Sequence, residues 1–71
     1  NNVGELLDYY IAECRKMIGK PAPIMSKAEK IETIRYLDDH GAFLITKAGD
    51  RICEYLEISK YTLYSYVNIN K

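Results

Sequence analysis

The sequence has few of the residues on which enzymes and metal sites depend. It contains one histidine, no serine in a nucleophile motif and four glycines that form no phosphate-binding loop. Asp38, Asp39 and His40 are consecutive, but neighbouring residues of a helix point in different directions and cannot converge on one ion. We therefore expect no catalytic constellation, no metal and no cofactor, and we do not expect an enzyme.

Long apolar runs are also absent. The longest is 42–45, far short of the roughly 20 residues that cross a bilayer, so no membrane span is expected. The chain begins with Asn1 and Asn2, without a methionine or the features of a signal peptide, and we expect it to be a piece of a longer protein. Its two cysteines, Cys14 and Cys53, are expected to be buried thiols rather than a disulfide, which fits a reducing cytoplasm.

The chain has no net charge, because ten basic and ten acidic residues cancel. This balance argues against a polybasic tail, a membrane-surface patch and nucleic-acid binding driven by charge alone. The charges are unevenly spread, however, since no acidic residue follows Glu57 whereas Lys60 and Lys71 do. The C-terminal end is therefore locally basic.

What the sequence does contain is the apolar periodicity of helices. Its 71 residues, about half of them apolar, predict one small all-α domain. The expected architecture is an N-terminal amphipathic helix in residues 1–19, a proline-containing connector in 20–25, and a three-helix module in 26–71.

The first predicted helix covers residues 3–18. Apolar residues recur there at steps of three and four, charged residues occupy the opposite face, and Gly19 ends the helix. The apolar stripe is wide for so small a domain, so it either packs on its own domain or forms a dimer contact, and both interpretations stay open. The candidate dimerisation residues are Val3, Leu6, Leu7, Tyr10, Ile11, Cys14 and Met17.

Two connections are expected between the helices. Pro21 and Pro23 should hold residues 20–24 extended, because each proline fixes its own φ and disfavours a helical predecessor. After the second helix, Gly41 should supply a left-handed stop, and residues 43–45 should form a buried connection.

Two further helices follow from capping signals. Ser26 and Glu29 have the spacing of a capping box, which starts the second helix. Thr46 is the expected N-cap of a third helix that runs to Leu56. The expected apolar face of the second helix consists of Ala28, Ile31, Ile34 and Leu37.

Residues 52–66 carry two short apolar stripes with a break at 57–58, which predicts two helices that meet at an angle. Ser59 can cap the second of them by accepting from the N–H groups two and three residues further on. That helix should therefore occupy about residues 60–69.

A helix, a tight turn and a second short helix form the helix-turn-helix unit, whose second helix enters the major groove of DNA. Residues expected to face inward are Ile58, Leu63, Tyr66 and Val67. The candidate DNA-binding residues are Ser59, Lys60, Tyr61, Thr62, Tyr64, Ser65 and Asn68, together with Lys47. The alternative is a helical oligomerisation or protein-docking module without DNA binding, since tyrosine is also common at protein interfaces.

The stretch ICEYLEISKYTLYSYV, residues 52–67, resembles the helix-turn-helix of bacterial regulators. More specifically, residues 27–67 resemble the C-terminal domain of YheO-like regulators, the group that includes the D-arginine utilisation repressor. The shared pattern is a lysine-containing helix, a Gly-x-Phe-Leu connection and a final Ser-x-Tyr-Thr-x-Tyr-x-Tyr helix. The resemblance implies a transcription regulator that binds double-stranded DNA as a homodimer or higher oligomer, with an N-terminal PAS-like sensor domain outside this chain.

The turn departs from the pattern of many such motifs. They have glycine where a left-handed conformation is common, whereas this chain has Glu57. A left-handed residue other than glycine costs roughly 1 kcal/mol. Cys53 occupies a position that is usually alanine-like, and it is small enough to pack there.

Overall fold

The computed structural model describes residues 3–69, and most of these residues are helical. In chain order the elements are α1 (Val3–Ile18), the short 3-10 helix η1 (Ala22–Ile24), α2 (Lys27–Asp39), the 3-10 helix η2 (Ala42–Leu44), α3 (Ala48–Leu56) and α4 (Lys60–Ile69). No strand occurs within this range. The predicted all-α class is therefore confirmed, and none of these helices is long and apolar enough to cross a membrane.

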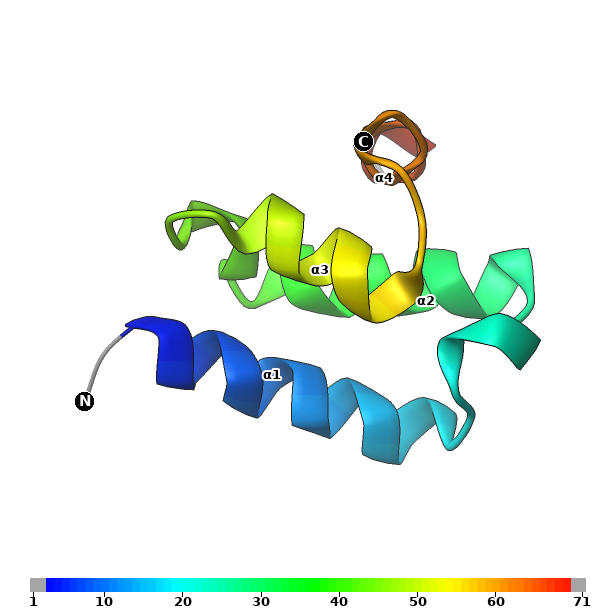
Figure 1. Cartoon of the computed structure of the whole chain (residues 1–71), viewed down its shortest axis with the longest axis horizontal. Coiled ribbons are helices and arrows are strands. Elements are labelled where there is room, and N and C mark those ends of the chain that lie inside the picture. Colours follow the sequence, from blue (N-terminus) through cyan, green and yellow to red (C-terminus); the bar gives the residue numbers. More distant parts are fainter. Residues whose placement is uncertain (1–2, 70–71) are drawn as a thin grey trace.

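The four α-helices are arranged around one core (Figure 1). α2 contacts α1 and α4, and α3 contacts the same two helices. In the view of Figure 1, α2 and α3 lie in the plane of the page and α4 is seen end-on, so α4 crosses α3 steeply. α1 covers the opposite side of α2 and α3 from α4.

α1 forms where the sequence predicts it. Leu7, Ile11 and Cys14 follow one another at helical spacing and are buried in the core. Gly19 ends the helix with φ +72, and its N–H donates to the carbonyl of Arg15 at 2.8 Å. Burial raises the pKa of the Cys14 thiol to about 11, with a contribution from the charge of Glu13, so this cysteine stays protonated at neutral pH.

The burial of α1 changes the dimerisation prediction. Leu7, Ile11 and Cys14 pack inside their own domain, so they cannot contact a second copy while this fold persists. Tyr10 is half-buried and packs against the core. Leu6 and Met17 are the candidates that remain exposed, and the side chain of Val3 lies outside the described part of the chain.

The connector is not fully extended as predicted. Residues 22–24 form a 3-10 turn in which the N–H groups of Ile24 and Met25 donate to Pro21 and Ala22 at 3.1 Å. The fixed φ of a proline suits the first turn of a 3-10 helix as well as an extended chain. The turn buries Ala22 and Met25 against the core. This burial offsets the cost of a helical conformation at Ala22, the residue before a proline.

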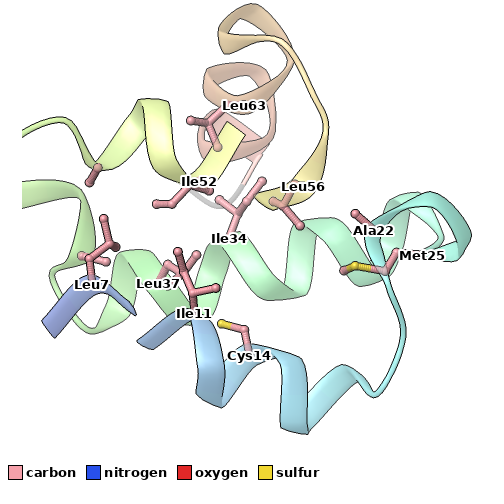
Figure 2. Packing of buried hydrophobic residues seen from close by; sticks show 12 residues of the cluster. Leu7, Ile11, Cys14, Ala22, Met25, Ile34, Leu37, Ile52, Leu56 and Leu63 are labelled. Carbon is pink, nitrogen blue, oxygen red and sulfur yellow. The ribbon is translucent and has the colours of Figure 1, made fainter. Parts of the chain in front are cut away.

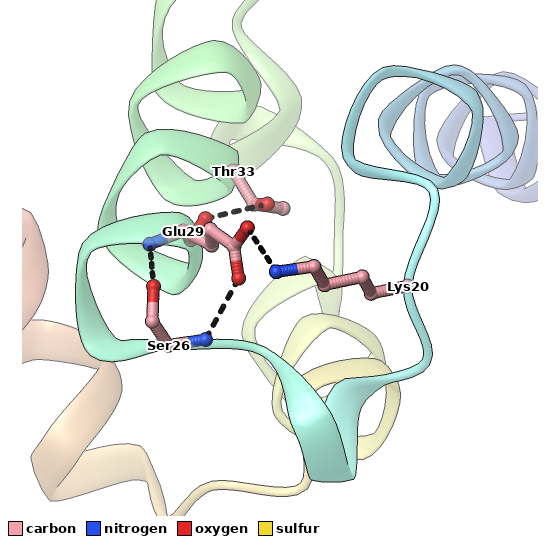
Figure 3. A network of polar contacts seen from close by, with 4 residues as sticks. All are labelled: Lys20, Ser26, Glu29 and Thr33. Carbon is pink, nitrogen blue, oxygen red and sulfur yellow. Dashed lines mark hydrogen bonds and ion pairs between the residues drawn. The ribbon is translucent and has the colours of Figure 1, made fainter.

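The capping box at the start of α2 is confirmed (Figure 3). The N–H of Glu29 donates to the Ser26 hydroxyl at 3.1 Å, and the N–H of Ser26 donates to the Glu29 carboxylate at 2.8 Å. Lys20 also binds this carboxylate at 2.8 Å, which ties the connector to α2. The hydrogen bond from Lys20, followed by that from Ser26, lowers the pKa of Glu29.

The buried face of α2 differs from the predicted one. Ile34 and Leu37 are buried as expected, but Ala28 is exposed and Ile31 is only half-buried. Thr33 is buried instead. Its hydroxyl donates to the Glu29 carbonyl at 3.0 Å, and this bond within the helix satisfies a polar group that apolar periodicity overlooks.

The connection between α2 and α3 also corrects two predictions. Gly41 has φ +75 as expected, but Leu44 is 91% exposed, and only Ala42 of η2 is buried. Thr46 does not cap α3, because the N-cap position belongs to Lys47, which is left-handed and makes no side-chain cap hydrogen bond. α3 therefore begins at Ala48, one residue later than a cap at Thr46 would place it.

The core lies where three helices meet above α1 (Figure 2). Leu63 of α4 points toward Ile52 of α3 and Ile34 of α2, and Leu56 lies beside them. All four side chains are fully buried. Leu63 is the only side chain of α4 in this fully buried set, so it fixes α4 to the rest of the domain.

Leu63→Ala should lower the free energy of unfolding by roughly 2 to 5 kcal/mol, because it removes buried apolar surface and leaves a cavity. Leu44→Ala is the matched control, since the same deletion at a 91% exposed leucine should change stability by less than about 0.5 kcal/mol. Urea unfolding followed by circular dichroism measures both. Equal effects would contradict the assigned role of Leu63.

Candidate nucleic-acid interface

The turn between α3 and α4 is closed by backbone hydrogen bonds. The N–H groups of Glu57 and Ile58 both donate to the Cys53 carbonyl, the latter at 3.1 Å. Glu57 is left-handed with φ 57, and Ile58 is half-buried against the core. This is a Schellman-type helix end, which normally has glycine at the left-handed position. The predicted break at residues 57–58 is confirmed.

Ser59 starts α4 as predicted. The N–H of Thr62 donates to the Ser59 hydroxyl at 3.1 Å, and the two hydroxyl oxygens are also 3.1 Å apart. Tyr61, the other expected donor, does not take part in this cap. Thr62 is half-buried, because its side chain belongs to the cap. α4 then runs over the expected range, Lys60–Ile69.

The inner face of α4 consists of the residues that the spacing predicts. Leu63 is fully buried, and Tyr66 and Val67 are half-buried and pack against the core. The ammonium group of Lys27, at the start of α2, lies 5.8 Å from the centre of the Tyr66 ring. Contacts with both α2 and α3 therefore fix the rotation of α4 about its own axis.

The outer face of α4 carries most of the candidate DNA-binding residues. Five of them line one open groove: Lys60, Tyr61, Tyr64, Ser65 and Asn68. We call this surface the α4 groove. Ser59 is exposed at its N-terminal end, and Lys47 is exposed at the start of α3. Five of the candidates thus share one face of α4, while Thr62 is turned toward the cap and Lys47 lies on α3.

α3 approaches the α4 groove at Gly49. A Cβ atom at this position would lie 2.8 Å from the Tyr64 hydroxyl, which is closer than real Cβ contacts allow. The missing side chain thus lets the phenol of Tyr64 lie against α3. Tyr64 remains 49% exposed, so it is supported on one side and accessible on the other.

An ion pair joins the same two helices. The ammonium group of Lys60 lies 2.6 Å from the Asp50 carboxylate, and the hydrogen bond to Asp50 raises the pKa of Lys60. The apolar pattern gives no sign of Gly49 or Asp50, because their roles depend on how α3 and α4 cross. Asp50 at the first turn of α3 is also where the helix dipole favours an acid.

Polar side chains also follow one another at the C-terminal end of α2, in Asp38, Asp39 and His40. No group of three or more His, Cys, Asp and Glu side chains is placed to hold a metal ion within residues 3–69. His40 stacks on Tyr36 with ring centres 4.0 Å apart, and its Nδ1 lies 2.8 Å from the Tyr36 carbonyl oxygen. The Asp-Asp-His run therefore ends a helix, with its histidine held by the preceding turn.

Two helices joined by a tight turn, with the second supported by a third helix and exposed along its outer face, define the helix-turn-helix class. Residues 6–68 match a family described as an HTH (helix-turn-helix) domain, and the protein belongs to this family. No curated protein and no solved structure matches the chain. The helix-turn-helix prediction is confirmed, while the narrower YheO-like resemblance stays a prediction.

Glu57→Gly should raise the free energy of unfolding by about 1 kcal/mol, because glycine adopts the left-handed conformation of the turn without strain. Glu32→Gly is the control, since the same change inside α2 should lower stability by about 1 kcal/mol. Thermal unfolding compares the two variants. A lower melting temperature for Glu57→Gly would mean that this side chain stabilises the turn in another way.

Proposed function

We propose that the chain is the sequence-specific DNA-binding domain of a bacterial transcription regulator, with α4 as the recognition helix. The observation that carries the proposal is the α4 groove, which gathers Lys60, Tyr61, Tyr64, Ser65 and Asn68 on a helix with no acidic residue. The helix-turn-helix family supports DNA as the partner. The role is binding and not catalysis.

The groove residues suit the edges of base pairs and the phosphates beside them. Lys60 can bind phosphate or guanine, Ser65 and Asn68 can donate and accept hydrogen bonds, and the two tyrosines can contact phosphate or thymine methyl groups. Ser59 and Lys47 lie at the N-terminal ends of α4 and α3, where phosphates approach a docked helix-turn-helix. With so few cations, the salt dependence of binding should be shallow.

We further propose that the regulator acts as a homodimer, with residues 1–19 linking this domain to an N-terminal PAS-like sensor. The Ser59–Tyr66 motif supports this YheO-like assignment. Leu6, Tyr9 and Met17 on α1 are about half exposed and offer apolar surface to a second copy. Two linked recognition helices would compensate for the low charge of each one.

Tyr64→Ala and Lys60→Ala should each weaken binding to duplex DNA by about five- to tenfold, roughly 1 kcal/mol, because each removes an exposed contact. Leu44→Ala in η2 is the control, since it truncates a 91% exposed side chain outside both α1 and α4. Fluorescence anisotropy with sites selected from random duplexes measures all three variants. If wild type selects no site, or if Tyr64→Ala and Lys60→Ala both bind like Leu44→Ala, the proposed interface is wrong.

Self-association should depend on the exposed apolar residues of α1. Met17→Glu should weaken the dimer about tenfold, because it places a charge among apolar side chains. Leu44→Glu is the matched control at an exposed leucine outside α1. Sedimentation equilibrium gives the dissociation constants, and a wild-type chain that stays monomeric at every concentration would contradict dimerisation through this domain.

A further inference from the structure

The recognition helix has one cation, and that cation is engaged inside the domain. Lys60 is the only charged residue between Lys60 and Ile69. Its ammonium group lies 2.6 Å from the carboxylate of Asp50, which projects from the first turn of α3. The pair bridges the two helices of the helix-turn-helix at the end of α4 that faces base edges in a docked complex.

We propose that Asp50 is a positioning residue that holds Lys60 against α3 and competes with DNA phosphate for its ammonium group, which restrains sequence-independent binding. The inference rests on the proposed function of the α4 groove. A lysine that binds phosphate attracts every DNA sequence equally, because phosphates carry no sequence information. A lysine held at a fixed place contributes to recognition of one particular arrangement of bases.

The solvent exposure of Lys60 and Asp50 determines how strongly Asp50 competes with phosphate. Both side chains are 58% exposed, so solvent screens their attraction and the ion pair stabilises the fold little. Phosphate can therefore displace Asp50 from Lys60, but the ion pair between Lys60 and Asp50 is then lost. Asp50 then adjusts affinity within a narrow range and does not block binding.

The neighbouring groups support a positioning role. Tyr64 lies against Gly49, the residue before Asp50, so two consecutive residues of α3 set the places of two side chains in the α4 groove. Lys60 and Tyr64 are one helical turn apart on α4, and both line that groove. The start of α3 therefore positions side chains in the first two turns of α4.

The test compares Asp50→Asn with wild type on a short mixed-sequence duplex over a range of salt concentrations. Asp50→Asn should bind about two- to fivefold tighter at low salt, because Lys60 becomes available to phosphate. One additional phosphate contact should steepen the slope of log K against log salt by up to about 0.9. Asp50→Glu, which keeps the charge, should restore the wild-type slope.

A double-mutant cycle separates positioning from simple charge repulsion. In a Lys60→Met background, Asp50→Asn should no longer change the slope if Asp50 acts through Lys60. Glu57→Gln removes an acid from the turn and should give the same through-space increase with or without Lys60. An undiminished effect of Asp50→Asn in the Lys60→Met background would overturn the proposal.

A second readout needs no DNA. The pKa of Lys60, measured by NMR in the free domain, should fall in Asp50→Asn but not in Glu57→Gln. An unchanged pKa overturns the ion pair itself. If wild type fails to bind the duplex at low salt, the proposed function fails; if wild type binds and Asp50→Asn matches it, only the inference about Asp50 fails.

Discussion

The burial of Leu63 between α2 and α3 is the constraint on which the rest of the structure depends. α4 has ten residues and buries only this one side chain fully, so its position is set by a single apolar contact and the half-buried residues around it. That contact turns the polar side of the helix outward. A fully apolar α4 would have been absorbed into the core, whereas a fully polar one would not have docked.

The ends of most helices could be predicted from the sequence, because they depend on interactions between residues that are close along the chain. The capping box at Ser26, the cap at Ser59 and the left-handed glycines at 19 and 41 act within a few residues, and all of them are confirmed. The errors lie where tertiary packing overrides local preference. Residues 22–24 curl to bury Ala22, and Leu44 is exposed although its neighbours are apolar.

The exposed face of α4 could be predicted in outline, whereas its contacts with α3 could not. Helical spacing alone separates Leu63 from Tyr64, because consecutive residues point about 100 degrees apart on a helix. It cannot show that Asp50 meets Lys60 or that Gly49 makes room for Tyr64, since those contacts depend on the crossing of α3 and α4. Pairings between elements require knowledge of the packing that joins them.

Arg51 links α1 to α3, the first helix of the helix-turn-helix. It binds Asp8 on α1 and Glu54 on its own helix, and Leu7 and Ile11 of α1 are buried in the core that α3 shares. α1 is therefore joined to α3 by an ion pair at Asp8 and through the apolar core of the domain. Because α2 and α3 each contact both α1 and α4, a displacement of α1 would reach α4 through these two helices.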